Sequence, residues 1–423
     1  MKEVNADIME LWDALKIKYE KYSQEGLDIN IERGWPCSEQ LDLSMSMLDI
    51  VTSKDNLRLE VDYRGYAGTG GIAPAKELFS QMLDVGTDEI YIAGTMSTTI
   101  MYDIISKAFL IGFMGDKPWK EYEEIKFICP SPGYEKHFKI CETFGIKMIP
   151  VKMFADGPDM DEVENIVRSD ETVKGIWCVP LYSNPTGAIY SDNVVRRLAN
   201  MPVKASDFKI FWDNAYCVHH LTDNVSSVLN ILEECKQAEN CFRPLIFAST
   251  SKMTFPGGGI AMCAACHEMI QWIKEKSLLQ LKTGDKINQL RHVRFFESIQ
   301  GIYAHMERHR RIIAPKFDLV NDILERNFRN GEIVTWIKPK GGYFFCIELL
   351  PQMAHSVWEI CKKAGVSFTP AGSIFPYGYD PEDKFIRIAP TYASMEDLEK
   401  AVDILSCAIK MIYLNNQYEI EEL

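Results

Sequence analysis

The chain has 423 residues and carries 46 Lys and Arg against 60 Asp and Glu, a formal net charge of −14. This length allows two or three domains, and ordinary shares of hydrophobic (47%) and charged (25%) residues exclude disorder as the main state. The acidic balance argues against nucleic-acid binding, which needs a basic face.

The sequence gives no reason to expect a membrane or an exported protein. No apolar run approaches the ~18 residues that a membrane-spanning helix needs. The first eleven residues lack a basic region followed by an apolar core, so no export signal is visible. We therefore expect the twelve cysteines to be reduced thiols in a cytoplasmic protein.

Short β-rich runs alternate with helical patterns from residue 90 onward. We predict strands at 90–93, 126–129, 147–153, 175–179, 208–212, 245–248 and 259–265, and helices at 99–112, 135–144, 160–168 and 194–201. This alternation predicts an α/β fold with a mainly parallel sheet covered by helices on both faces. The loops at the carboxyl ends of such strands are where a ligand binds.

The last ninety residues change character. Residues 333–337 and 343–347 are expected to form a hairpin, followed by a helix at 357–364, a strand at 385–388 and a long helix at 395–413. This order predicts a second, smaller α+β domain.

Several short motifs suggest other chemistries. Three matches, at 249–252 (S-x-x-K), 191–193 (S-D-N) and 282–284 (K-T-G), resemble those of penicillin-recognising serine enzymes, but their order and surroundings differ from that class. Cys263 to His267 fits a haem-attachment pattern, yet it lies in an apolar strand, where a buried cysteine behaves as a small hydrophobe. His219-His220 has no second cluster at ligand spacing, so we expect no metal site.

A different set of polar residues follows successive strands in a fixed order. Asn184-Pro-Thr-Gly187, Asp213-Asn-Ala-Tyr216 and Ser249-Thr-Ser-Lys252 each follow a predicted strand, and Arg387 lies in an apolar strand of the smaller domain. In these residues the chain resembles the class I aminotransferases, pyridoxal-phosphate enzymes of fold type I. It is most similar to the type 1c aspartate aminotransferases, whose shared runs match 182–187, 211–216, 288–294 and 338–343.

The resemblance implies a seven-stranded, mainly parallel sheet in a large cofactor-binding domain at 52–325. The remaining parts, 1–51 and 326–423, would form the small domain that closes over the substrate.

The resemblance also assigns catalytic roles. Lys252 would hold the aldehyde of pyridoxal 5'-phosphate as a Schiff base and then carry the α-proton. Asp213 would pair with the pyridine nitrogen and keep the ring protonated. Asn184 and Tyr216 would donate to the ring's phenolic oxygen, and Tyr134 would stack on the ring.

The cofactor phosphate would lie at the start of a helix, at Gly94, Thr95, Met96 and Ser97, with hydroxyl donors from Ser249 and Ser251. Tyr66 would reach the phosphate of the other subunit, which implies a homodimer. Many aminotransferases place an Arg eight residues after the lysine, but here that position is Ile260, so what replaces that Arg is open.

Substrate contacts follow from the same resemblance. Arg387 would clamp the α-carboxylate with its guanidinium fork, with Asn184 beside it. Gly34 belongs to a backbone segment that closes over the substrate. A second substrate carboxylate needs another cation, and the candidates are Arg64, Arg291, His292 and Arg294.

The resulting hypothesis is a ping-pong aminotransferase for aspartate and 2-oxoglutarate. Transamination of an aromatic or aliphatic amino acid, or a lyase reaction on the same cofactor, remains the alternative. A more distant alternative is that the chain is the ligand-sensing domain of a transcription regulator, although residues 1–60 are too short and too acidic to form a DNA-binding domain.

Overall fold

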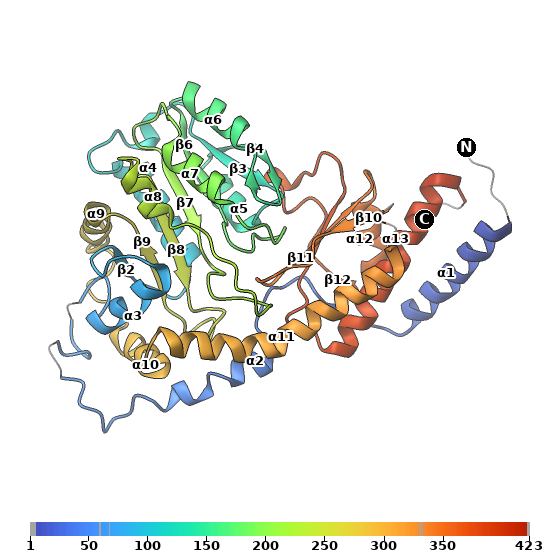
Figure 1. Ribbon diagram of the computed structural model, residues 1–423, viewed down its shortest axis with the longest axis horizontal. Coiled ribbons are helices and arrows are strands. Elements are labelled where there is room, and N and C mark those ends of the chain that lie inside the picture. The colour runs from blue at the N-terminus through green and yellow to red at the C-terminus, as the bar shows by residue number, and fades with distance from the viewer. Residues whose placement is uncertain (1–5, 59–60, 67, 330, 332, 421–423) are drawn as a thin grey trace.

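The computed structural model describes residues 6–58, 61–66, 68–329, 331 and 333–420. They form a larger and a smaller lobe, and one long helix, α11 (Ile299–Phe328), runs beneath the larger lobe into the smaller one (Figure 1). The first and last described helices, α1 (Ala6–Gln24) and α13 (Met395–Tyr418), both lie on the smaller lobe.

The larger lobe is built on a mixed sheet. Its strands, in spatial order, are β2 (Ile90–Ile92), β9 (Ala261–Ala264), β8 (Pro244–Ser249), β7 (Lys209–Asp213), β6 (Val173–Cys178), β3 (Lys126–Ser131), β4 (Lys147–Phe154) and β5 (Gly157–Pro158). The five central strands from β8 to β4 are parallel, whereas β9 is antiparallel to both its neighbours and β5 is antiparallel to β4.

The predicted α/β class is therefore confirmed, but the sheet has eight strands among the described residues instead of seven. The additional strand, β5, has two residues and pairs only with the edge strand β4. So short a strand cannot show an alternating pattern, which is why the sequence did not reveal it.

Helices connect and cover these strands. They are α3 (Ala73–Leu83), α4 (Ser97–Ile111), α5 (Glu135–Thr143), α6 (Met160–Ser169), α7 (Asp192–Asn200), α8 (Ile231–Gln237), α9 (His267–Ser277) and α10 (Lys286–Phe296), with short 3₁₀ turns at Met45–Leu48, Trp119–Glu121 and Pro376–Gly378. Side chains at the N-caps fix four of the starts: Asp159 for α6, Ser191 for α7, Asn230 for α8 and Asp285 for α10 each accept from the backbone of the first turn.

The smaller lobe contains the predicted hairpin. β10 (Val334–Trp336), β11 (Phe345–Leu349) and β13 (Phe385–Ile388) form an antiparallel sheet, accompanied by α12 (Ala354–Lys363) and α13 (Met395–Tyr418). The N-terminal chain joins this lobe through two elements: α1 (Ala6–Gln24) packs on α13, and β1 (Ile29–Asn30) pairs with β12 (Val366–Ser367). The next helix, α2 (Ser38–Asp42), contacts α11.

Two large hydrophobic clusters correspond to the two lobes. Helix α11 contributes Ile302 and Met306 to the first cluster, and Ile313 and Phe317 to the second. The division into domains at residues 51 and 325 remains a prediction.

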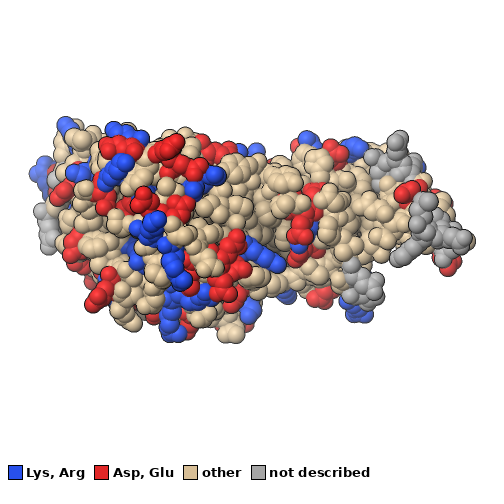
Figure 2. Space-filling view, turned by 90° about the horizontal axis from the view of Figure 1, so that it is seen from above, with Lys and Arg blue, Asp and Glu red and all other residues tan. Residues whose placement is uncertain are grey.

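The surface carries charges of both signs. Acidic and basic side chains are interspersed over the larger lobe, and the waist between the lobes is mostly uncharged on the face seen in Figure 2. All twelve cysteines are free thiols. Within the described ranges, no helix has the length and apolar character needed to cross a bilayer.

Candidate active site

A cavity of about 530 Å³ opens where the carboxyl ends of the central strands face the smaller lobe. It collects eleven of the predicted site residues: Gly34, Met96, Ser97, Tyr134, Asn184, Asp213, Tyr216, Ser249, Ser251, Lys252 and Arg387. Gly94, Thr95 and Tyr66 are not among the residues that line it. The cavity therefore brings together residues that are up to 353 positions apart in the chain.

Asp213 is the last residue of β7, and one of its two carboxylate oxygens is held by a neighbouring side chain. His137 Nε2 lies 3.0 Å from Asp213 Oδ2, while Oδ1 of the same carboxylate is buried and has no hydrogen-bond partner in the described protein. The His137 ring is stacked on Trp177, with 4.2 Å between centroids and 6° between planes. The free oxygen of this carboxylate can accept a hydrogen bond from a ligand in the cavity.

Our sequence predictions missed His137. It lies three residues after Tyr134, on the first turn of α5, whose start follows β3 and its carboxyl-end loop. A histidine one helical turn from a residue already assigned to the site was the available signal.

Lys252 lies just beyond the end of β8. Burial lowers the pKa of its amine, an effect that Asp213 and Glu135 partly oppose. Its Nζ lies 5.3 Å from the centroid of the Tyr216 ring. A lowered pKa increases the fraction of neutral amine, which is the nucleophilic form.

The backbone around Lys252 is fixed from the smaller lobe side. The Tyr343 hydroxyl donates to the Lys252 carbonyl at 3.1 Å, and Gln40 Nε2 donates to the Tyr343 oxygen at 2.9 Å. Gln40 Nε2 also lies 2.9 Å from His309 Nδ1. This buried chain of hydrogen bonds positions the lysine and was also not predicted.

The start of α4 forms the anion-binding end of the cavity. Met96 is the N-cap and makes no side-chain cap, so the first-turn N–H groups are available to a ligand. Met96, Ser97 and Thr98 line the cavity, and the hydroxyls of Ser249 and Ser251, 2.8 Å apart, lie on its wall. The preceding Gly94 has φ +68° and turns the chain into the helix.

Ile260, eight residues after Lys252, is buried in the core of the larger lobe. Its backbone N–H donates to Thr250 Oγ1 at 2.9 Å, and its carbonyl accepts from the Thr250 N–H at 2.9 Å. An anion at this end of the cavity would therefore depend on the start of α4 and on the two serine hydroxyls.

Arg387 is 4% exposed and is held on several sides. Its Nε donates to Thr369 Oγ1 at 2.8 Å and its Nη1 to Asn184 Oδ1 at 3.2 Å. Both Nη groups also donate to Glu135, at 2.5 and 3.2 Å, and the guanidinium carbon lies 4.5 Å from the centroid of the Phe344 ring. The fork assigned to a substrate carboxylate is thus occupied by a carboxylate of the protein itself.

The segment from Glu32 to Pro36 forms the outer wall of the cavity. The Ala389 N–H donates to the Ile31 carbonyl at 2.7 Å, which ties this segment to the end of β13. A Cβ on Gly34 would lie 2.5 Å from the Phe344 ring, so a larger residue would require the ring to move. The same ring therefore contacts both the closing segment and Arg387.

None of the four cations suggested for a second carboxylate lines the cavity. His292 Nε2 is hydrogen-bonded to the hydroxyls of Thr250 and Thr254, and burial lowers the pKa of the His292 ring to about 4, which keeps it neutral near pH 7. Arg64 is paired with Asp62, and Arg294 with Asp55. Arg291 lies on α10 outside the cavity lining. The further cations that line the cavity are Arg33 and Lys136.

Tyr66 is 80% exposed and contributes nothing to the cavity of its own chain. Whether it enters the cavity of a second subunit remains a prediction.

The competing motifs find structural explanations. Ser191 caps α7, and residues 282–284 precede α10, away from the cavity. Cys263 is buried in β9, and His267 Nδ1 lies 2.9 Å from Asp88 on the surface. The described residues contain no group of three or more His, Cys, Asp or Glu arranged to hold a metal ion.

Comparisons with known proteins find related sequences and structures. The family model described as aspartate amino-transferase matches residues 4–419. An aspartate aminotransferase of Corynebacterium glutamicum is 37% identical over 93% of this chain and 92% of its own length. The crystal structure of an aspartate transaminase from that species has a TM-score of 0.94 at 36% identity and covers 98% of both chains. At 21% identity, the α-aminoadipate aminotransferase LysN of Thermus thermophilus shares the fold, with a TM-score of 0.74 over 93% of this chain and 95% of its own; its structure contains N-(5'-phosphopyridoxyl)-L-leucine.

Proposed function

Because the chain belongs to the aspartate aminotransferase family and is a transaminase, we propose that it transfers the amino group of L-aspartate to 2-oxoglutarate, with pyridoxal 5'-phosphate bound at Lys252. One observation carries this proposal. A partly buried lysine, a carboxylate with one unsatisfied oxygen and a buried guanidinium converge on a single cavity.

The residues present fit the cofactor. The unpartnered Oδ1 of Asp213 is an acceptor for a protonated ring nitrogen, and the start of α4 is suited to a phosphate. The amine of Lys252 fits the aldehyde. When bound, the cofactor supplies the electron sink for the charge left behind by the α-proton.

The protein's own groups account for the remaining steps. Lys252, with its lowered pKa, can take the α-proton as a neutral amine and return it at the neighbouring carbon. Arg387 orients the amino acid through its carboxylate. The segment that includes Gly34 and Trp35 covers the cavity and excludes water.

The choice of aspartate requires a second cation near the substrate. Arg33 and Lys136 line the cavity, and Arg33 is held 4.4 Å above the Trp35 ring. We infer that Arg33 receives the distal carboxylate, because its planar fork binds carboxylates bidentately.

The test is to titrate the purified, cofactor-loaded protein with single amino acids while the cofactor absorbance is followed. Aspartate and glutamate should each convert the cofactor to its aminated form, and Lys252→Ala should abolish this response. Lys139→Ala, an exposed lysine paired with Glu142 on α5, is the matched control. A response to another amino acid but not to aspartate or glutamate would overturn the substrate assignment.

We also propose a homodimer in which Tyr66 enters the other subunit's cavity, and cytoplasm as the compartment. The exposure of Tyr66 and the twelve free thiols support these two proposals. Mixing Lys252→Ala chains with Tyr66→Ala chains should restore activity, because hybrid dimers contain one intact cavity. No restoration after subunit exchange would contradict the assignment of Tyr66 to the partner.

A further inference from the structure

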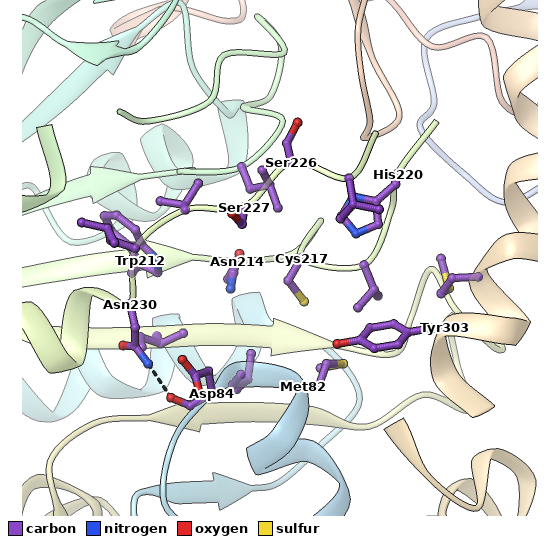
Figure 3. Close-up of a pocket in the computed structure, with 18 of the residues that line it drawn as sticks. Met82, Asp84, Trp212, Asn214, Cys217, His220, Ser226, Ser227, Asn230 and Tyr303 are labelled. Atoms are coloured by element: carbon purple, nitrogen blue, oxygen red, sulfur yellow. Dashed lines mark hydrogen bonds between the residues drawn. The ribbon is translucent and has the colours of Figure 1, made fainter. Parts of the chain in front are cut away.

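A second cavity, of about 560 Å³, lies in the larger lobe (Figure 3). It is bounded by β7 and the loops that follow it, by the end of α3 and by α11. Its apolar lining includes Leu83, Trp212 and Met306. This volume falls within the range of roughly 300–1,000 Å³ that small-molecule sites occupy.

The second cavity shares one wall with the candidate active site. Along the segment that follows β7, Asp213, Ala215 and Tyr216 line the active-site cavity, whereas Asn214 and Cys217 line the second cavity. Figure 3 shows Asn214 and Cys217 pointing into the second cavity from the shared segment. A ligand there would therefore contact the same stretch of backbone that positions Asp213 and Tyr216.

The polar groups of the second cavity favour a cation. Three carboxylates, those of Asp84, Asp223 and Glu307, line it together with one guanidinium, Arg310. Arg310 donates to Glu307 at 2.6 and 2.8 Å and lies 2.8 Å from Asp223, and Arg311 donates to Glu307 at 3.0 Å, so two guanidiniums face three carboxylates. The lining therefore keeps a net negative charge, which opposes anions and attracts cations.

An aromatic ring adds to this preference. Tyr303, on α11, is half exposed, and its hydroxyl points into the cavity in Figure 3. The Asn230 side chain, which donates to the Asp84 carbonyl, closes the opposite side. An organic cation with an apolar body could place its charge near the carboxylates and the Tyr303 ring, and its body against Leu83 and Met306.

We propose that this second cavity is an effector site for a small amphipathic organic cation, and that its occupancy is felt at the active site through the shared segment 212–218. Helix α11 forms the other side of the second cavity and continues into the smaller lobe, so a bound cation would also contact the helix that joins the two lobes.

The test uses benzyltrimethylammonium, whose quaternary nitrogen cannot condense with an aldehyde, on the full-length, cofactor-loaded protein. Calorimetric titrations are run with saturating maleate, an unreactive dicarboxylate that keeps anions out of the Arg387 site. Phenylacetate, an aromatic anion of similar size, is the charge-reversed control. We expect saturable binding of the cation, roughly tenfold tighter than binding of phenylacetate.

Substitutions locate the binding. Ser227 lies on the exposed loop at the cavity, so Ser227→Trp should fill the space and weaken cation binding roughly tenfold, while Ser227→Ala should leave it unchanged. Tyr303→Leu provides a second variant at an exposed position and should weaken binding a few-fold. Equal binding of both probes, or unchanged binding to Ser227→Trp, would overturn the site.

The effect of the second cavity on the active site is measured separately. Without maleate, saturation with the cation should shift the absorbance of the bound cofactor or change the KM for aspartate. A tightly bound cation that alters neither would overturn the proposed influence on the active site.

Discussion

The ion pair between Glu135 and Arg387 allows us to predict how much one substitution changes the affinity of the cavity for a carboxylate. Glu135 belongs to α5 in the larger lobe and Arg387 to β13 in the smaller lobe, and both Nη groups of the arginine donate to this glutamate. A substrate carboxylate that binds the same two groups must first displace Glu135. Glu135→Gln keeps the size of the side chain but removes the competing charge.

The magnitude follows from the burial of the two partners. A hydrogen bond to a charged group contributes about 1.5–3 kcal/mol, but the Glu135 side chain is 26% exposed, so solvent reduces this contribution. Glutamine also retains one neutral hydrogen bond to the fork. A net loss of about 1 kcal/mol from the competing contact should tighten carboxylate binding about fivefold.

The assay is a titration of the cofactor-loaded protein with maleate, which binds but cannot react, followed by absorbance or calorimetry. Glu142→Gln is the control, because Glu142 lies on the same helix and pairs with Lys139 on the surface. The reasoning is refuted if Glu135→Gln binds maleate with the affinity of the unmodified protein, or more weakly.

Three further predictions concern groups around the site. His137→Phe should remove the hydrogen bond to Asp213 and lower kcat about tenfold, because such outer contacts orient the group that touches the cofactor; an unchanged kcat with bound cofactor would argue against this positioning role. Gly34→Ala should place a methyl group 2.5 Å from the Phe344 ring, which should destabilise the packing of segment 32–36 over the cavity by about 1–3 kcal/mol. We therefore expect a higher KM for aspartate, and an unaltered KM would show that the ring can move aside. The pKa of His292 is about 4 in the folded protein and 6.5 ordinarily, so the unfolded chain binds more protons between these two pH values. The free energy of unfolding should therefore decline by about 3 kcal/mol as the pH falls from 6.5 to 4. Urea unfolding of His292→Gln should show a smaller decline over this range, and a decline equal to that of the unmodified protein would contradict the prediction.

The strand-end residues could be predicted because a parallel sheet imposes their convergence. Lys252, Asp213 and Asn184 each follow a hydrophobic run, and the topology places the ends of those runs at one edge. The antiparallel direction of β9 could not be read from 259–265, because hydrophobic patterning carries no information on strand direction.

The residues that hold the site in place were harder to predict. Glu135 and His137 lie in the run Tyr-Glu-Lys-His, whose polarity is that of any exposed helix start. Gln40 and Thr369 approach the site from segments more than 200 and 100 positions away from Lys252. Their roles depend on tertiary contacts, which a local pattern does not encode.

Helix α11 also bears on how the protein unfolds. Its 30 residues contribute to the hydrophobic cluster of each lobe, and Lys316 near its middle donates to the carbonyls of Thr391 and Ala393 at 2.8 and 2.7 Å. Neither lobe can lose this helix without exposing apolar surface of the other, so the two lobes should melt together as one cooperative unit.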